Sequence, residues 1–112
     1  MSKLVIDDSR ILNLKGKVEY ARTPEQGIAA LKKRRKWDEL WLDHDLGLQN
    51  WIPVDIWPVI DYLEESKPKI GQIFIITSNP VGAQRIKLPL DKIGYSTTIR
   101  DPFPVLAGIL PW

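Results

Sequence analysis

The sequence lacks cysteine altogether and has one histidine and one methionine among its 112 residues. Without cysteine there are no disulfides, thiolate nucleophiles or cysteine-based zinc sites, and a single histidine excludes a metal site built from several histidines. No apolar run approaches the ~20 residues of a membrane-spanning helix, and the amino terminus lacks the basic region and long apolar stretch of a signal peptide. We therefore expect a cytoplasmic protein with no membrane partner.

The composition is that of an ordinary globular protein, with 44% hydrophobic and 27% charged residues. A chain of this length is too short for two separate cores, so we expect one domain over residues 1–112. The net charge of +2 does not by itself indicate a polyanionic partner. The basic run at residues 32–36 is more typical of a solvated helix end than of a nucleic-acid site, because cations favour helix C-termini.

Two apolar runs end abruptly in acidic residues. Residues 3–6 precede Asp7 and Asp8, and residues 40–42 precede Asp43. Short apolar runs of this kind are typical of strands that are covered on both faces. In an open parallel sheet, ligands bind beyond the carboxyl ends of the strands, so these acids mark the edge where chemistry is expected.

Three further segments have strand character. Residues 17–21 alternate like a partly solvated edge strand, residues 72–77 are β-branched and aromatic, and residues 96–99 are polar and β-branched. Helices are expected from Thr23 and Pro24 to about residue 35, from Asp55 to about Ser66, and from Pro80 until Pro89 breaks or kinks the segment.

The order of these elements predicts an α/β fold of three layers around a parallel five-stranded sheet. Right-handed crossovers give the flavodoxin-like strand order 2-1-3-4-5. The connection at residues 9–16 is short for a parallel crossover, and prolines interrupt the tail at residues 103–112. We therefore expect the first and last helices to be reduced.

In such a sheet the polar ends of four strands meet at one edge. Asp7, Asp8 and Asp43 would repel one another there, and a hard divalent cation, best Mg²⁺, would relieve that repulsion. The alternative is that these acids cap helices or form structural ion pairs. Arginine and hydroxyl groups beside such a metal would suit a phosphate.

Candidate phosphate ligands come from the ends of the last two strands in the sequence. Thr77, Ser78 and Asn79 would hold phosphate oxygens, or would cap the helix that follows them. Arg100 would bind phosphate, or would pair with a local acid such as Asp101.

The single histidine is a candidate general acid or base. His44 lies between Asp43 and Asp45, which would raise its pKa, and we expect these three residues to form the catalytic group. Neighbours on a strand face opposite sides, so His44 could equally point away from Asp43. Trp51 would either stack on a base near the site or cover the sheet, which is the commoner role of tryptophan.

The acidic strand ends resemble those of the receiver domains of response regulators. Asp7 and Asp8 match their acidic pair, Asp43 their phosphoacceptor aspartate, and Thr77 their switch hydroxyl, while Arg100 stands near their lysine.

Three segments carry more specific motifs, namely Asp7-Asp8-Ser9-Arg10, Leu42-Asp43-His44-Asp45-Leu46-Gly47 and Asn79-Pro80-Val81-Gly82. They are similar to the opening, central and fourth-strand motifs of the cyclic-phosphate processing receiver domains, and the similarity covers about residues 3–99. Ile11 stands where that family usually has proline, and Ile76 or Thr77 where it has histidine. The resemblance implies a receiver-like fold, and its opening motif favours Arg10 as a phosphate ligand.

The resemblance implies Mg²⁺-dependent processing of a cyclic phosphate, carried on an RNA end or a phosphorylated small molecule such as a nucleotide. The alternatives are a non-catalytic module that binds phosphate, nucleotide or a protein partner, for which the tail offers a surface, and an aspartyl-phosphate switch at Asp43.

Overall fold

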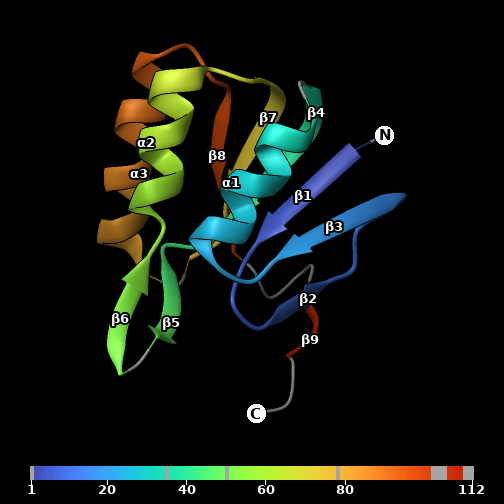
Figure 1. Ribbon diagram of the computed structural model, residues 1–112, viewed down its shortest axis with the longest axis vertical. Coiled ribbons are helices and arrows are strands. Elements are labelled where there is room, and N and C mark those ends of the chain that lie inside the picture. The colour runs from blue at the N-terminus through green and yellow to red at the C-terminus, as the bar shows by residue number, and fades with distance from the viewer. Residues whose placement is uncertain (1, 35, 50, 78, 102–105, 110–112) are drawn as a thin grey trace.

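The computed structural model describes residues 2–34, 36–49, 51–77, 79–101 and 106–109. Its elements, shown in Figure 1, are in chain order β1 (Ser2–Ile6), β2 (Arg10–Leu12), β3 (Lys17–Ala21), α1 (Pro24–Lys33), β4 (Lys36–Leu42), β5 (Asp45–Gln49), β6 (Ile52–Asp55), α2 (Trp57–Ser66), β7 (Lys69–Ile75), α3 (Pro80–Lys92), β8 (Thr97–Ile99) and β9 (Leu106–Ile109). No helix in the described part of the chain is long and apolar enough to cross a bilayer.

A parallel five-stranded sheet forms the centre of the molecule. Its strand order is β3-β1-β4-β7-β8, which confirms the predicted 2-1-3-4-5 order and the α/β, flavodoxin-like fold class. Val5 of β1 lies opposite Tyr20 of β3 on one side and Trp41 of β4 on the other. All five strands therefore point their carboxyl ends to the same edge of the sheet.

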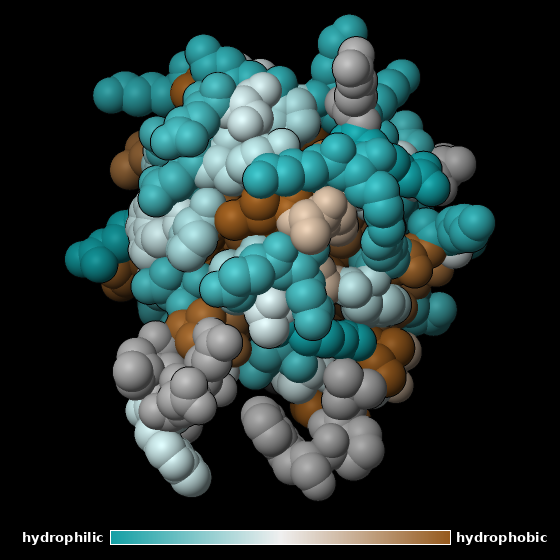
Figure 2. Space-filling model, in the orientation of Figure 1, coloured by the Kyte–Doolittle hydropathy of each residue, from teal (hydrophilic) through white to brown (hydrophobic). Residues whose placement is uncertain are grey.

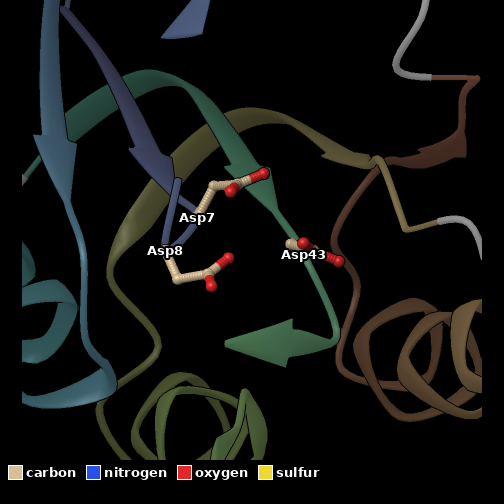
Figure 3. A group of neighbouring side chains, drawn as sticks. All are labelled: Asp7, Asp8 and Asp43. Carbon is tan, nitrogen blue, oxygen red and sulfur yellow. The ribbon is translucent and has the colours of Figure 1, made fainter. Parts of the chain in front are cut away.

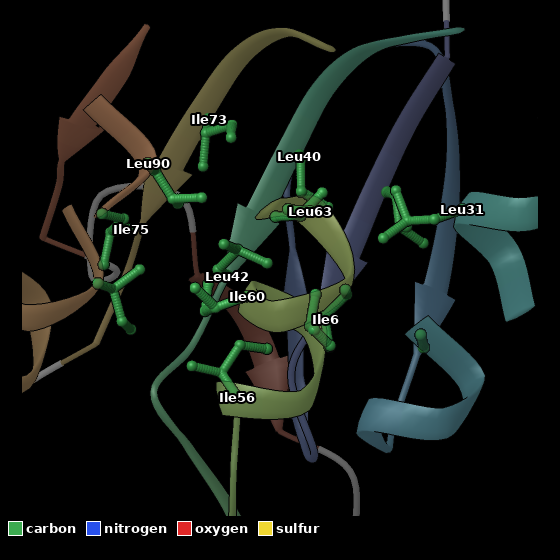
Figure 4. Close-up of a cluster of buried hydrophobic side chains, with 14 of the residues drawn as sticks. Ile6, Leu31, Leu40, Leu42, Ile56, Ile60, Leu63, Ile73, Ile75 and Leu90 are labelled. Atoms are coloured by element: carbon green, nitrogen blue, oxygen red, sulfur yellow. The ribbon is translucent and has the colours of Figure 1, made fainter. Parts of the chain in front are cut away.

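The main core lies between the sheet and the three helices. Figure 4 shows Leu40 and Leu42 of β4 pointing toward Ile60 and Leu63 of α2, and all four are fully buried. Side chains alternate along a strand, so these even-numbered positions face the helices while Trp41 between them faces away. In Figure 1 the three helices lie side by side on this one face.

The opposite face of the sheet is covered in part by strands instead of helices. Residues 10–12 form β2, which pairs with β9 in an antiparallel manner, so the reduction of the first and last helices is confirmed. Leu12 of β2 packs with Val5, Trp41 and Ile76. The expected third layer is thus present on this face, but it is made of strands.

The helices begin close to the expected residues. The hydroxyl of Thr23 accepts a hydrogen bond from the Gln26 backbone N–H, as predicted for the start of α1. Helix α2 begins at Trp57, slightly later than expected, although Asp55 still accepts a hydrogen bond from the Trp57 backbone N–H. Of the predicted break or kink at Pro89, the break is absent, since α3 continues to Lys92.

Between β4 and α2 the chain forms a hairpin of β5 and β6. Asp45 pairs with Asp55 at its base and Gln49 with Ile52 near its tip. Trp51 lies in the turn with a φ of 65° and is 90% exposed, so the expectation that it covers the sheet is wrong.

Candidate functional site

Three aspartates meet at the carboxyl edge of the sheet. Asp7 and Asp8 follow β1, and Asp43 follows β4. The hydrogen bonds between these two strands continue past the end of β4, since the Asp43 N–H donates to the Ile6 carbonyl at 3.1 Å. One carboxylate oxygen from each aspartate lies within 4.8 Å of those of the other two. Figure 3 shows the three side chains near one another at the ends of β1 and β4. Asp7 and Asp43 are buried and Asp8 is partly exposed.

Arg10 reaches into this cluster and pairs with two of its members. Its Nη1 lies 3.0 Å from Oδ2 of Asp43 and 3.2 Å from Oδ2 of Asp7, and it also donates to the Ile76 carbonyl at 3.4 Å. The opening motif favours this arginine as a phosphate ligand, and the structure contains its ion pairs with Asp7 and Asp43. Among the described residues, its Nε and Nη2 atoms have no hydrogen-bond partner.

The cluster raises the pKa values of two of its carboxyl groups. Burial, and then the Asp7 charge, raise the pKa of Asp43 to about 6, against the lowering effects of Arg10, the Asp45 backbone N–H and a hydrogen bond with Thr77. Burial, and then the Asp7 charge, also raise the pKa of Asp8. Both shifts therefore come first from removal of the carboxyl groups from water and second from repulsion by the Asp7 charge.

Arg22 fixes the loop that carries Asp7 and Arg10, and sequence reasoning missed it. Its Nη1 donates to the backbone carbonyls of Asp7 and Arg10 at 3.1 and 2.7 Å. The Asp7 carboxylate in turn accepts the backbone N–H groups of Ser9 and Arg10, both at 3.0 Å. The one available signal was that Arg22 directly follows the strand at residues 17–21, as the other candidates follow theirs.

Gly47 leaves room for the Asp8 carboxylate. A Cβ placed on Gly47 would lie 2.6 Å from Oδ2 of Asp8, and the glycine has a φ of 78°. This left-handed conformation and the close approach both require the absence of a side chain. The glycine of the central motif thus positions an acid that lies 39 residues earlier in the chain.

Thr77 and Asn79 connect the acidic cluster to the start of α3. The Thr77 hydroxyl lowers the pKa of Asp43 and accepts the backbone N–H of Asn79 at 3.1 Å. The Asn79 side chain caps α3 by accepting the Gly82 N–H at 3.1 Å. Both residues therefore make the capping contacts that the sequence allowed, close to a helix N-terminus. Ser78, which was predicted with them, lies outside the described residues.

His44 lies beside the start of α3. Its Nδ1 is 3.0 Å from Oδ1 of Asp45, and a Cβ on Gly82 would lie 3.0 Å from the imidazole carbons. Among the described residues it makes no hydrogen bond with Asp7, Asp8 or Asp43. The histidine therefore borders the Asn79 end of the site instead of the centre of the acidic cluster, and Asp45 is exposed.

Arg100 lies apart from the acidic cluster. Its guanidinium carbon is 5.5 Å from the centre of the Trp41 ring, which faces away from the helices and stacks on Phe74. Its backbone N–H donates to the Ile75 carbonyl at 2.8 Å. The structure thus brings Arg10 to the acids and places Arg100 on the strand-covered face of the sheet.

The donor set fits a hard divalent cation. Such ions prefer carboxylate oxygens, and this site offers three carboxylates on two neighbouring strand ends. With all three ionised and Arg10 protonated, the local charge is about −2, which one divalent ion would balance. The acidic cluster could therefore bind a metal.

One comparison with known proteins found a match. A sequence model described as the cyclic-phosphate processing receiver domain matches residues 2–92. The matched range holds the three aspartates, Arg10 and the α3 start, and it ends where that helix ends. Searches of the curated proteins and of the solved structures found no match.

Proposed function

The chain belongs to the cyclic-phosphate processing receiver domain family, and we propose that it hydrolyses cyclic phosphates on RNA ends or nucleotides with the aid of Mg²⁺. The observation that supports this proposal most directly is the meeting of three carboxylates within 4.8 Å beside Arg10. A cluster of carboxylates can bind a phosphodiester only together with cations, because both are negatively charged. The three carboxylates of the acidic cluster suit one divalent cation.

Asp7, Asp8 and Asp43 would hold the metal ion. When bound, Mg²⁺ would supply positive charge to the phosphate oxygens as negative charge develops there. Asp43 is central to this set because it pairs with Arg10 and because Thr77 lowers its pKa. Arg22 and Gly47 are positioning residues, since they hold the loop of Asp7 and leave space for Asp8.

Groups that surround the metal ligands would bind the phosphate. Nη1 of Arg10 pairs with Asp7 and Asp43, and these two contacts fix the orientation of the planar guanidinium group. Its remaining N–H groups suit two oxygens of one phosphate. Thr77 would add its hydroxyl and Asn79 its side-chain amide N–H groups, close to the N-terminus of α3.

Hydrolysis of the cyclic phosphate needs two proton movements. A water oxygen forms a bond to phosphorus and loses a proton, while one ribose oxygen leaves phosphorus and gains a proton. His44 is the candidate for either transfer, because the Asp45 carboxylate beside Nδ1 favours a proton there and leaves Nε2 for exchange. The product is a phosphate monoester.

A second candidate function is a non-catalytic module that binds phosphate or nucleotide. One observation favours it: the His44 ring packs beside Gly82 and has no hydrogen bond to the acidic cluster in the described residues. In that case Arg10 and the α3 start would hold an anion, and no bond would break.

The decisive experiment uses wild-type protein, Mg²⁺, 2′,3′-cyclic AMP and an RNA with a 2′,3′-cyclic phosphate end. Formation of a phosphate monoester is followed by phosphorus NMR. We expect product with the wild type, none with Asp43→Asn, and a loss of about 10²-fold or more in kcat with His44→Ala. Asp61→Asn, on the exposed side of α2, is the matched control and should be fully active.

The outcomes separate the two candidates. Unchanged substrate with wild-type protein, together with saturable substrate binding that Arg10→Ala weakens, would support the binding module. Product formation that survives Asp43→Asn would contradict the proposed site.

A further inference from the structure

A basic hollow lies at the amino end of the strands, opposite the acidic cluster. It has a volume of about 600 Å³ and is formed where the end of α1 and the start of β4 meet the connection from α2 to β7. Five cationic side chains line it, namely Lys32, Arg34, Lys36, Lys67 and Lys69. Figure 2 shows mostly hydrophilic side chains at the top of the molecule, where Figure 1 has the end of α2 and the start of β7.

No carboxylate lines this basic hollow among the described residues, although the Lys36 charge reaches Asp38, whose pKa is lowered first by the hydrogen bond from the Ser2 N–H and then by nearby cations. None of its five cations forms an ion pair with a carboxylate in the described part of the chain, whereas Lys33 on the same helix pairs with Glu19 at 2.6 Å. The acids at the end of α2, Glu64 and Glu65, do not line the hollow. Like charges gathered in a concavity raise the local potential and attract polyanions.

An aromatic side chain forms part of the same wall. The Tyr62 ring lies 5.8 Å from Nζ of Lys32, and Tyr62 is partly exposed. A positive groove with aromatic rings is the usual chemistry of single-stranded nucleic-acid binding, since phosphates meet the cations and bases stack on the rings. An anionic membrane surface would not require a hollow of this shape.

We infer that the basic hollow binds the backbone of a single-stranded RNA whose cyclic-phosphate end lies at the acidic cluster. This inference rests on the proposed function and narrows its substrate from nucleotides to RNA ends. The tertiary fold carries the argument, because it adds Lys67 and Lys69 to a basic run that had appeared only to solvate a helix end.

The distance between the two sites sets the length of RNA that can reach both. Lys36 begins β4 and Asp43 follows its end, so the straight-line separation of the sites along the strand is about 23 Å at ~3.3 Å per strand residue, and an RNA that passes over the surface must span at least this distance. At a stacked rise of ~3.4 Å per nucleotide, this distance corresponds to about seven nucleotides. An RNA of three nucleotides would occupy the acidic cluster alone.

The first experiment measures binding without any reaction. A fluorescent 12-nucleotide RNA with an ordinary 3′-hydroxyl is titrated with wild-type protein and with the double variant Lys67→Asn/Lys69→Gln. Asparagine suits residue 67 because Lys67 has a left-handed backbone, with a φ of 45°. The double variant Lys15→Gln/Arg85→Gln removes the same charge from exposed positions outside the basic hollow.

We expect the hollow variant to bind the 12-nucleotide RNA roughly tenfold more weakly and the control to change less than about twofold. Five phosphate contacts predict a slope of about −3.5 for log affinity against log salt, and the hollow variant should reduce its magnitude by about 1.4. Equal weakening in both double variants, or no RNA binding at low salt, would overturn the inference.

The second experiment tests length. Wild-type protein should show a KM about tenfold lower for a 12-nucleotide than for a 3-nucleotide RNA with the same cyclic-phosphate end, and the hollow variant should lose this difference with kcat unchanged. RNA binding without any turnover would support RNA binding at the basic hollow and contradict the proposed hydrolysis. Failure of the inference is therefore distinguishable from failure of the proposed function. Stronger binding of polyglutamate or of phosphatidylserine vesicles than of RNA would overturn the inference.

Discussion

Nη1 of Arg10 lies 3.0 Å from Oδ2 of Asp43, so the arginine of the opening motif pairs directly with the aspartate of the central motif. The Arg10 side chain is only 19% exposed and that of Asp43 only 8%, so water screens this attraction weakly. The pair connects the loop after β1 to the end of β4. It also fixes the guanidinium beside the cluster that would hold the metal ion.

Replacement of this arginine should destabilise the fold. Arg10→Ala leaves Asp7 and Asp43 buried without their cation, and removal of one partner of a buried pair typically costs about 3–5 kcal/mol. We expect a loss of about 3 kcal/mol in the free energy of unfolding, measured in urea at pH 7. Lys33→Ala breaks the more exposed pair with Glu19 and should cost less than about 1 kcal/mol. Equal losses in the two variants would contradict this assignment.

The metal-free protein should become less stable as pH rises through the range in which Asp43 ionises. The folded pKa of about 6 lies above the ordinary 3.8, so between these values the folded carboxyl keeps a proton that the unfolded chain has lost. Stability is therefore full below about pH 4 and falls by about 3 kcal/mol by pH 6 and above. Asp8, whose pKa is also raised, adds a change of the same sign.

Urea unfolding with EDTA from pH 4 to pH 8 measures this dependence. Asp43→Asn should flatten most of the decline, and Asp61→Asn should leave it unchanged because Asp61 is exposed on α2. A decline of the same size in Asp43→Asn would show that other groups cause it.

Mg²⁺ should stabilise the folded protein, and more so at high pH. Protons compete with the ion for Asp43 and Asp8, so the affinity should rise from pH 5 to pH 7. At ten times its dissociation constant the ion should add about 1.4 kcal/mol to the free energy of unfolding. Thermal unfolding with and without MgCl₂ measures the effect. Asp8→Asn should raise the Mg²⁺ concentration needed for half-maximal stabilisation at least tenfold. An unaltered response would show that the ion binds elsewhere.

Gly47→Ala should weaken the metal site as well as the backbone. The new methyl group would lie 2.6 Å from Oδ2 of Asp8, so that carboxylate must move. Gly16→Ala is a matched control, because Gly16 has a similar φ of 85° and a Cβ there meets nothing within 4 Å. Both variants should lose about 1–2 kcal/mol of stability from the left-handed backbone. Only Gly47→Ala should also raise the Mg²⁺ concentration needed for half-maximal stabilisation, measured by the same thermal titration.

The sequence predicted the sheet well because its strands are marked by local patterns. Apolar runs ending in Asp7 and Asp43 indicated central strands, and the crossover rule then gave the observed strand order. It predicted a break or a kink at Pro89, and the break is absent because α3 continues to Lys92. Leu90 is fully buried, and the packing of this last turn outweighs the hydrogen bond that proline removes.

The hairpin of β5 and β6 and the pairing of β2 with β9 could not be predicted from local patterns. These strands are short, and each is stabilised by a partner that is distant in the sequence or by a turn with an unusual residue. Trp51 takes a positive φ in that turn, which a sequence rule would assign to glycine or asparagine. Arg22 likewise donates to backbone carbonyls. Every residue has a backbone carbonyl, so the sequence gives no indication of which ones Arg22 contacts.

By itself the sequence determined that aspartates end two neighbouring parallel strands, since strand order and strand direction follow from local pattern and chain connectivity. Only the tertiary structure decided that Arg10 turns inward to Asp43 while Arg100 lies over Trp41, and that Lys67 and Lys69 join the basic end of α1. The physical reason is that backbone pairing constrains where a strand ends, whereas the direction of a long charged side chain depends on the burial and charge of neighbours far away in the sequence.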